Sequence, residues 1–251
     1  MEHGFLDRHS DLDSPVHRLD PRAKVLLALA VVIAAVSTPP QHLLAFAVYA
    51  GLLAWTLALA RLPAGYVLGR AALVLPFSML VALGLPFFRG GQTVAVAGLQ
   101  LSVAGLWILA GAAMKSFIGA LAAVLLVSTT PFASLLAGLR GLGLPALFID
   151  LLALTYRYVF VLVGEAMRLK RAAAARGYRP RWLPQAVIVG RMAGSLFVRS
   201  YERAERMYGA MRLRGYLGRM PAARPLRFRL ADGLTLAVLL PVLAAVRILA
   251  R

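Results

Sequence analysis

The chain has 251 residues, of which 61% are hydrophobic and 15% are charged, and its mean hydropathy is +0.76. Because a soluble domain carries about 25% charged and about 45–50% apolar residues, this composition excludes an ordinary soluble protein and indicates a polytopic membrane protein. The chain contains no cysteine, which also excludes disulfides and thiolate metal sites.

The formal net charge of +18 is concentrated in one segment. Residues 165–229 contain sixteen Arg and Lys against three Glu, while the other twelve basic residues are spread over the rest of the chain. A basic block beside membrane spans is typical of the cytoplasmic side. The same charge would also suit anionic lipid head groups, nucleic acid or an acidic partner protein.

The first segment, residues 1–20, is polar and lacks the charged and apolar regions of a cleavable signal peptide. It contains His3, His9 and His17 together with several Asp, which are residue types that bind divalent metal ions. Their spacing matches no closed metal site, so we interpret the segment as an ordinary polar terminus.

Five apolar stretches approach the roughly 20 residues that a membrane-spanning helix needs. They are residues 24–38, 43–60, 67–88, 106–130 and 230–246. The first begins near Pro21, which suits the first turn of a helix, and ends at Pro39-Pro40, which cannot continue one. The third is expected to kink at Pro76 and to close at Arg89-Gly90-Gly91. Residues 92–105 alternate weakly and are predicted to form a loop or an interfacial segment.

Three helices are predicted between the fourth and the last span. A short amphipathic helix covers residues 132–140, a long helix covers 146–176, and another covers 185–214. Five apolar residues of this last helix fall on one stripe and predict that it packs one face: Phe197, Tyr201, Ala204, Tyr208 and Met211. Glu202 and Arg206 form an i,i+4 pair away from the stripe.

The distribution of Arg and Lys predicts the topology. It places the N-terminus, the loop that carries Arg61 and Arg70, and the basic segment inside, with the C-terminus outside. The predicted organisation has four parts: a cytoplasmic segment 1–20, a four-span membrane bundle 21–130, a cytoplasmic helical segment 131–229 and a final span 230–251.

An alternative topology has residues 144–164 as a further span, because this stretch is apolar enough to cross. Crossing there would move the basic helices to the other side of the membrane. Asp150 and Arg157 lie seven residues apart on one helical face, which argues against exposure to lipid. We therefore interpret the stretch as lying against the bundle at the membrane surface.

Two copies of one short signature end the two long helices of the basic segment. They are Ala175-Arg176-Gly177 and Leu213-Arg214-Gly215, 38 residues apart, and each is followed by Tyr. Gly supplies the left-handed turn that ends a helix, and Arg lies near the negative end of the helix dipole. Ordinary helix ends have this form too. The repetition favours two helix ends that dock on a partner with two-fold symmetry. At each end the guanidinium group would pair with carboxylates of the partner better than a Lys would.

Other polar residues lie at the first and fourth spans. Asp20, Pro21, Arg22 and Lys24 predict an N-cap, a first helical residue and positive anchors on the inner side. Lys115 lies within the fourth span, where an ionisable group has a function or pairs with a neighbour such as Asp150; both alternatives remain open. The sequence contains no phosphate-binding loop, nucleophile elbow or metalloprotease helix.

Together these residues resemble the transmembrane T component of energy-coupling factor (ECF) transporters, and within that family the cobalt-type CbiQ subunits. The resemblance covers essentially the whole chain. It rests on residues 12–24, on Thr155-Tyr156-Arg157-Tyr158 and on the two Arg-Gly ends. At the second end, Leu213 stands where the family usually has Ala.

The resemblance implies an all-α helical membrane bundle of about five spanning helices, with two amphipathic coupling helices, in the bacterial cytoplasmic (inner) membrane. Ala175, Arg176 and Gly177 would dock on one CbiO-like ATPase subunit, and Leu213, Arg214 and Gly215 on a second. The bundle would hold a CbiM-like substrate-binding membrane subunit and a small accessory membrane subunit.

The resemblance also implies what this chain does not do itself. It would bind no cofactor and would catalyse no reaction, because ATP and Mg would be bound by the ATPase partners. The transported ion would be cobalt, for cobalamin biosynthesis, with nickel or a vitamin as the alternative. Nucleic acid is not an expected partner.

Two functions of other classes compete with this interpretation. A membrane-embedded enzyme would need converging polar residues within the spans, where the sequence offers Lys115, Asp150, Arg157 and few others. A binder of nucleic acid or anionic lipid would account for the basic charge but would not need two repeated helix ends.

Overall fold

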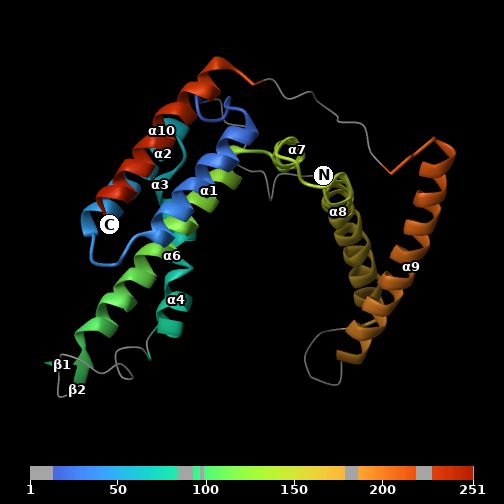
Figure 1. The fold of residues 1–251 in the computed structure, drawn as a ribbon. Helices are drawn as coiled ribbons and strands as arrows, with labels where there is room; N and C mark the ends of the chain where they lie inside the picture. The colour runs from blue at the N-terminus through green and yellow to red at the C-terminus, as the bar shows by residue number, and fades with distance from the viewer. Residues whose placement is uncertain are drawn as a thin grey trace. The chain divides into compact units, whose positions relative to one another are not determined.

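The computed structural model describes residues 14–82, 84, 93–96, 99–178, 186–218 and 228–250 (Figure 1). The chain divides into two compact units, of which the first comprises Met1–Leu142 with Pro225–Arg251 and the second Gly143–Arg224. Helices make up the described chain apart from one short hairpin, which confirms the predicted all-α class. His3, His9, Asp13 and the predicted stop at Arg89-Gly90-Gly91 lie outside the described residues.

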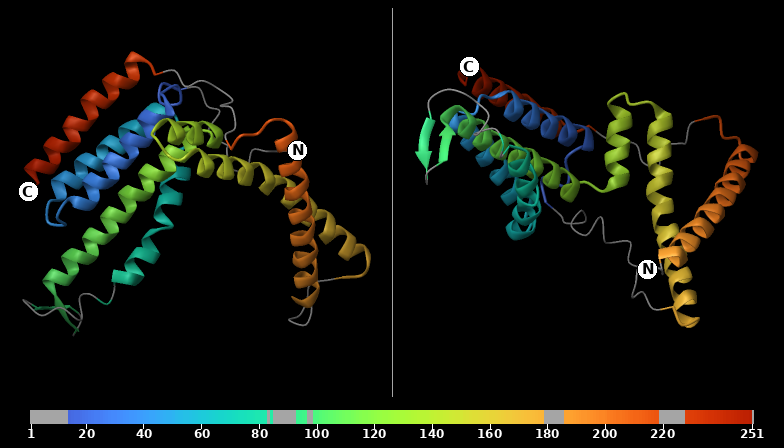
Figure 2. Two further views of the ribbon diagram at one scale, coloured as in Figure 1. Left: turned by 45° about the vertical axis from the view of Figure 1, so that its right-hand side comes forward. Right: turned by 90° about the horizontal axis from the view of Figure 1, so that it is seen from below.

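The first unit is a helical bundle. Its helices are α1 (Pro21–Ser37), α2 (Leu43–Ala60), α3 (Ala64–Ala72), α4 (Leu75–Ala82), α6 (Val103–Thr129), α7 (Phe132–Gly141) and α10 (Leu230–Leu249). In both Figure 1 and Figure 2, α10 lies beside α1, so the first and last helices of the chain are neighbours. Helix α1 also packs against α6 and α7, and α6 in turn supports α2, α3 and α4.

Helix α1 begins and ends where its sequence predicts. The side chain of Asp20 accepts a hydrogen bond of 2.8 Å from the backbone N–H of Arg22, and Pro21 occupies the first helical position. The helix ends before Pro39-Pro40 because proline provides no N–H to continue the ladder. Helix α2 has the predicted bounds and ends at Arg61, whose φ of 54° is left-handed.

The third predicted span is broken rather than kinked. Helix α3 ends at Ala72, and α4 begins at Leu75 after a two-residue turn. Pro76 lies in the first turn of α4, four residues after Ala72, and a proline ring clashes with the carbonyl of the residue four positions earlier. The predicted proline is therefore the physical cause, but the break precedes it.

Residues 92–105 were predicted to form a loop or an interfacial segment; the loop was wrong, and an interfacial position stays a prediction. Strands β1 (Thr93–Val96) and β2 (Leu99–Ser102) form an antiparallel hairpin in which Thr93 is opposite Ser102 and Val96 opposite Leu99. Helix α6 then begins at Val103, three residues earlier than predicted, with the Ser102 hydroxyl accepting from the Gly105 N–H at 3.5 Å. The weak alternation of the sequence was a strand pattern.

The core of the bundle lies where α1, α2, α3 and α6 meet. Tyr49 and Val67 are completely buried there, and Val31, Ile118 and Leu121 are nearly so. The Tyr49 hydroxyl lies 3.2 Å from the hydroxyl of Thr38, so its polar end is satisfied inside the core. This core brings the two ends of the bundle chain, at α1 and α10, into one folded unit.

Small residues allow the closest helix contacts. A Cβ on Gly138 of α7 would lie 2.9 Å from the Cβ of Pro21, and a Cβ on Gly111 of α6 would lie 2.5 Å from that of Pro40. A side chain at either position would collide with the proline, so the close approach of the two segments requires glycine at both positions. They bring α7 and α6 against the two ends of α1.

The second unit consists of two long helices, α8 (Ala146–Ala175) and α9 (Ala186–Leu213), which run in opposite directions and pack together (Figure 1). Both bounds agree with the predicted helices within one or two residues. The apolar stripe of α9 is exposed in this chain, with Phe197 71%, Tyr201 59% and Tyr208 57% accessible. Within the described chain nothing covers these three side chains, and the predicted packing of this face stays a prediction.

Five described helical stretches are long and apolar enough to cross a membrane. They are Leu43–Ala60, Ala64–Val81, Val103–Thr129, Ala146–Ala175 and Leu230–Leu249. This number agrees with the predicted five, but α8 replaces α1 in the set. Helix α1 has 17 residues and is about 25 Å long, which is at the lower limit of the roughly 17–25 residues that a spanning helix has. Both the sidedness and the crossing of residues 144–164 therefore remain predictions.

Candidate coupling site

The first Arg-Gly end closes α8 with two backbone hydrogen bonds. Gly177 has φ +81°, and its N–H donates to the carbonyl of Ala174 at 3.0 Å. The N–H of Tyr178 donates to the carbonyl of Ala173 at 3.1 Å. This pair of bonds is a Schellman motif, which needs a left-handed residue after the last helical one.

The second end, at α9, makes the same two backbone hydrogen bonds as the first end. Gly215 also has φ +81°, and its N–H donates to the carbonyl of Arg212 at 3.0 Å. The N–H of Tyr216 donates to the carbonyl of Met211 at 3.0 Å. The sequence repeat is therefore a structural repeat, in which Arg176 and Arg214 hold the same place relative to their glycines.

Both ends are presented to the surroundings. Leu213 is 92% accessible, Ala175 and both arginines are exposed, and the two tyrosines that follow the glycines are partly covered. Within the described chain, the guanidinium groups of Arg176 and Arg214 make no hydrogen bond or ion pair. Each end thus offers five N–H donors beside the negative end of a helix dipole, an arrangement that suits a carboxylate on another protein.

One exposed residue beside the second end was not predicted. Leu217 is 93% accessible and is followed by Gly218, a third left-handed glycine with φ +81°. The spacing Gly215-Tyr216-Leu217-Gly218 in the sequence was the available signal. Leu217 adds an exposed apolar side chain to the α9 end.

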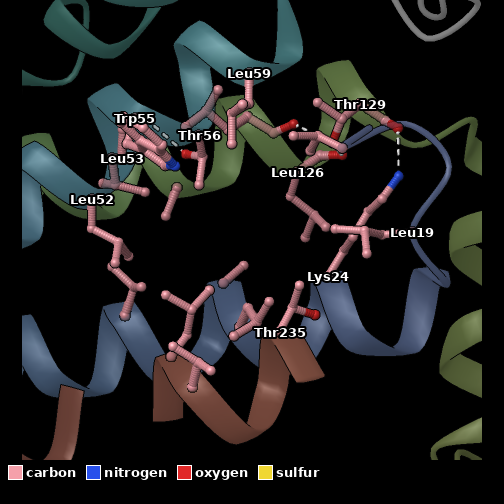
Figure 3. Close-up of a pocket in the computed structure, with 18 of the residues that line it drawn as sticks. Leu19, Lys24, Leu52, Leu53, Trp55, Thr56, Leu59, Leu126, Thr129 and Thr235 are labelled. Carbon is pink, nitrogen blue, oxygen red and sulfur yellow. Dashed lines mark hydrogen bonds between the residues drawn. The ribbon is translucent and has the colours of Figure 1, made fainter. Parts of the chain in front are cut away.

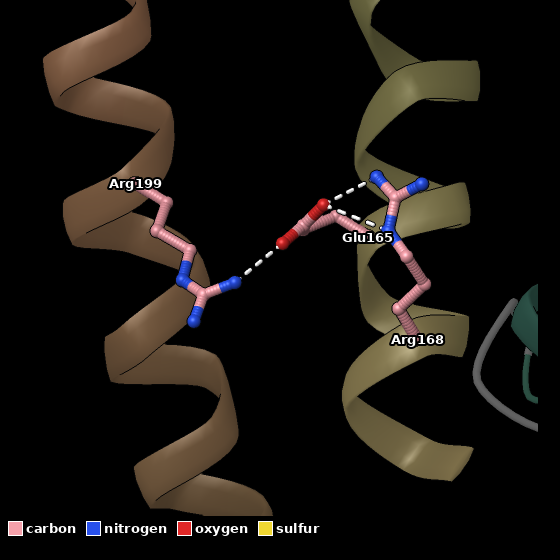
Figure 4. Close-up of polar contacts among 3 residues, drawn as sticks. All are labelled: Glu165, Arg168 and Arg199. Carbon is pink, nitrogen blue, oxygen red and sulfur yellow. Dashed lines mark hydrogen bonds and ion pairs between the residues drawn. The ribbon is translucent and has the colours of Figure 1, made fainter. Parts of the chain in front are cut away.

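A carboxylate that the sequence did not single out joins the two helices (Figure 4). Glu165 of α8 accepts a hydrogen bond from Arg199 of α9, with 2.5 Å between Oε1 and Nη1, and its other oxygen pairs with Arg168 on its own helix. The predicted pair of Glu202 and Arg206 is present at 3.7 Å on the exposed surface of α9. Within the described residues, Glu165 makes an ion pair that connects α8 and α9.

The predicted N-terminal anchors form a buried polar cluster in the bundle. The N–H of Asp20 donates to Oδ1 of Asp232 at 2.8 Å, and the N–H of Arg229 donates to its Oδ2 at 2.7 Å. Lys24 donates from Nζ to the carbonyl of Thr129 at 2.9 Å. Asp20, Lys24 and Asp232 are 5%, 7% and 1% accessible. These residues hold the start of α1 against α10 and α6, which is a structural role.

Sequence reasoning missed Asp232, the acceptor at the centre of this cluster. An Asp in the first turn of the last predicted span was its only signal, because its partner amide is 212 residues away. Arg22 lies in the same region, against Gly141, where a Cβ would lie 2.1 Å from its Nε. The close contact holds α7 beside the first turn of α1.

The remaining predicted residues lie apart from this cluster. Lys115 donates from Nζ to the carbonyl of Val36 at 2.7 Å, near the other end of α1. This contact gives Lys115 a backbone partner within the bundle, and a further role for it remains a prediction. Asp150 is buried in the first turns of α8, and Arg157 is exposed two turns later. Beside Arg157, the rings of Tyr156 and Phe160 make an edge-to-face contact at 5.2 Å.

The described residues contain no group of three or more His, Cys, Asp or Glu that could hold a metal ion. His17 is engaged locally, since its Nδ1 lies 2.7 Å from the hydroxyl of Ser14. The two other N-terminal histidines lie outside the described part.

Comparison with known proteins indicates a family for this chain. The family model described as CbiQ, cobalt transport protein, matches residues 13–223. The cobalt transport protein CbiQ of Rhodobacter capsulatus is 32% identical over 227 residues, which cover 88% of this chain and 89% of the relative.

Two further relatives carry related names. The putative fused cobalt transport protein CbiMQ of Methanocorpusculum labreanum is 28% identical over 87% of this chain, which spans only 38% of that fused relative. The energy-coupling factor transporter transmembrane protein EcfT of Listeria innocua is 27% identical over 92% of each chain. The matched range of the family model includes both Arg-Gly ends.

Proposed function

Because the chain belongs to the CbiQ cobalt transport family, we propose that it is the transmembrane coupling subunit of an ATP-driven importer of the energy-coupling factor type. The names of the CbiQ and EcfT relatives support this assignment. The single observation that carries the coupling role is the pair of matching Arg-Gly ends, exposed on two helices of one structural unit.

We assign each end to one copy of a dimeric ATPase. A partner with two-fold symmetry offers two equal docking sites, and two helix ends of the same form can bind both sites in the same way. Arg176 and Arg214 would pair with carboxylates there, while Ala175 and Leu213 would pack beside them. The longer side chain of Leu213, 92% accessible, would enter an apolar recess at the second site.

Motion of the ATPases would pass to the membrane through α8 and α9. The bond between Glu165 and Arg199 and the packing of the two helices would make them move as one rigid pair. When ATP binding draws the two ATPases together, both ends would shift and the pair would tilt. This chain would supply the lever, and ATP and Mg would be bound by the ATPases.

The other partners would be membrane subunits. The fused relative is named CbiMQ, which supports a CbiM-like substrate-binding subunit as the neighbour, with a small accessory subunit beside it. The exposed aromatic stripe of α9 would be a contact face, since an accessible patch of this kind marks an interaction site. Cobalt is the proposed cargo, on the family description, with nickel or a vitamin as the alternative.

The proposed location is the bacterial cytoplasmic membrane, with the N-terminus and both Arg-Gly ends inside. The basic residues from 165 to 229 support this orientation. On this proposal the segment 1–20, the bundle 21–130, the coupling segment 131–229 and the final span 230–251 keep their predicted sides. Helix α7 belongs structurally to the bundle, so it would lie at the inner membrane surface.

Copurification tests this proposal directly. The tagged chain, produced with its chromosomal neighbours and purified in mild detergent, should bring two ATPase copies and a membrane subunit. Arg176→Glu and Arg214→Glu should each weaken the hold on the ATPase copy at that end, because a carboxylate now faces a carboxylate. The double variant should lose both ATPase copies and ATP-dependent cobalt uptake.

Arg206→Glu is the matched control, since it reverses an exposed charge on α9 two turns before the end and should keep both ATPase binding and cobalt uptake. Uptake near the wild-type level in the double variant would contradict the coupling role. Uptake of nickel or a vitamin in place of cobalt would identify the alternative cargo.

A further inference from the structure

A largely apolar cavity of about 450 Å³ lies within the bundle, between α2 and α6 on one side and α1 and α10 on the other. Figure 3 shows leucine, threonine and tryptophan side chains from both sides pointing into it. Its volume falls in the range of about 300–1,000 Å³ that is usual for sites of small molecules. The cavity is therefore large enough for an organic ligand.

The polar groups of its wall are already engaged. The hydroxyls of Thr56, Thr129 and Thr235 each donate to a carbonyl three or four residues earlier in the same helix, at 2.8–2.9 Å. Lys24 donates to the carbonyls of Thr129 and His17 at 2.9 and 3.2 Å. A buried water needs about two to four polar partners, and an apolar cavity favours an apolar occupant. The wall thus favours hydrocarbon over water or an ion.

A second cavity, of about 520 Å³, shares a lining residue with the first and is more polar. Both are lined by Leu19, and the second also by Arg18, Arg61 and Arg229. All three arginines are exposed. They come from the N-terminal turn, the end of α2 and the start of α10, so three separate elements place guanidinium groups around one opening.

One carboxylate, Asp232, also lines this second cavity. It is 1% accessible, and its two oxygens accept from the N–H groups of Asp20 and Arg229 at 2.8 and 2.7 Å. Its charge and that of Asp20 are balanced in part by buried Lys24, with which both interact electrostatically. Among the described residues, the exposed charge at the opening is therefore positive.

We propose that these two cavities form one binding site for an anionic diacyl phospholipid. Its phosphate would lie among the arginines, and one acyl chain would enter the apolar cavity past Leu19. Guanidinium groups bind phosphate through paired N–H donors, and basic pockets between membrane helices suit anionic head groups. Trp55, 68% accessible at the cavity margin, is a residue type that lies at the membrane interface.

The two halves of the site together select this ligand. A transported metal cation would be repelled by the arginines, and a free phosphate ion would leave the apolar cavity unfilled. A zwitterionic phospholipid would fill the cavity but would bring an ammonium group to a basic opening. The proposed site lies within the bundle unit, and the proposal does not rest on the coupling role of α8 and α9.

Native mass spectrometry of the purified chain in mild detergent tests the site. Phosphatidylglycerol should bind one to one, and at least tenfold more tightly than phosphatidylcholine, the fold-change that roughly one hydrogen bond to a charged group supplies. Arg61→Gln and Arg229→Gln should each remove most of this preference. The matched control is Arg247→Gln, at the other end of α10, which should retain it.

A cavity-filling change tests the acyl-chain half. Ala28 lines the cavity and is only partly buried, so Ala28→Phe should block both phospholipids; Leu59→Trp, at the more exposed margin, serves if the first variant is not monodisperse. Equal binding of the two lipids, equal loss in Arg247→Gln, or full binding in a folded cavity-filling variant would overturn the proposal. Inorganic phosphate competing as strongly as phosphatidylglycerol would also overturn it, because the acyl chain of the lipid would then contribute nothing to binding.

Discussion

Single residues decide the form of the two Arg-Gly ends. Gly177 and Gly215 have the same φ of +81°, a region that costs an ordinary L-residue about 1–2 kcal/mol. The arginine before each glycine is therefore placed by backbone geometry rather than by side-chain contacts. Without the left-handed turn, the last carbonyls of each helix would lose their N–H partners.

Replacing either glycine should consequently weaken ATPase binding without unfolding the protein. Gly177→Ala or Gly215→Ala should reduce the affinity for the ATPase roughly five- to thirtyfold, the equivalent of the left-handed strain. Surface-immobilised ATPase and purified chain in detergent would measure this. Gly164→Ala is the control, because Gly164 lies inside α8 with open space around its Cβ position, and that change should leave the affinity unaltered.

Asp232 has a comparable importance for the bundle. It accepts two backbone hydrogen bonds while almost completely buried. Asp232→Ala should lower the free energy of unfolding by at least about 3 kcal/mol, since each hydrogen bond to a charged group contributes about 1.5–3 kcal/mol. Lys24 would also remain buried without one of its two compensating charges.

Thermal unfolding in one detergent would measure the loss. Glu202→Ala, which removes an exposed carboxylate with a 3.7 Å partner, should change the stability by no more than about 1 kcal/mol. Equal melting temperatures for the two variants would mean that Asp232 does not hold α10 to α1.

At the scale of elements, the second unit is two long helices whose ionic connection is Glu165 with Arg199. An ion pair between long side chains at the surface adds little to stability. Its value for the proposed mechanism is geometric, because it keeps α8 and α9 in one register while the ATPases move. Loss of the pair should uncouple motion at one end from motion at the other.

Glu165→Arg should therefore leave ATPase binding intact and reduce cobalt uptake per ATP hydrolysed severalfold. The double variant Glu165→Arg with Arg199→Glu restores opposite charges across the helices and should recover coupling. Hydrolysis and uptake in reconstituted vesicles would measure both. If the swapped pair were as uncoupled as the single variant, the connection between α8 and α9 would not depend on this contact.

The elements also show what the sequence could predict. The bounds of α2 and the starts of α1 and α10 follow from apolar length and from proline, and both Arg-Gly ends follow from local backbone chemistry. The hairpin at Thr93–Ser102 was missed because two four-residue strands leave too few alternations to separate from a loop. Asp232 and Glu165 were missed because their partners are 212 and 34 residues away, and no local pattern carries such pairings.

At the scale of the whole molecule, function depends on which side of the membrane each unit occupies. Helix α8 is long and apolar enough to span, yet the proposed coupling role would place both Arg-Gly ends on the ATPase side. These requirements agree if the apolar half of α8 lies against other membrane subunits at the inner surface. The buried Asp150 near its start favours this position, because a carboxylate facing lipid is costly.

Cysteine labelling would decide this topology, and the chain needs no prior removal of cysteines since it has none. Leu144→Cys precedes α8 and Lys170→Cys lies near its end, and both positions are exposed. We expect a membrane-impermeant thiol reagent to label both in inverted vesicles and neither in intact cells. Gln41→Cys, between α1 and α2, should show the reverse. Labelling of Leu144→Cys and Lys170→Cys from opposite sides would establish α8 as a spanning helix. In that case the end of α8 could contact the ATPases only if the topology were different, with the N-terminus outside.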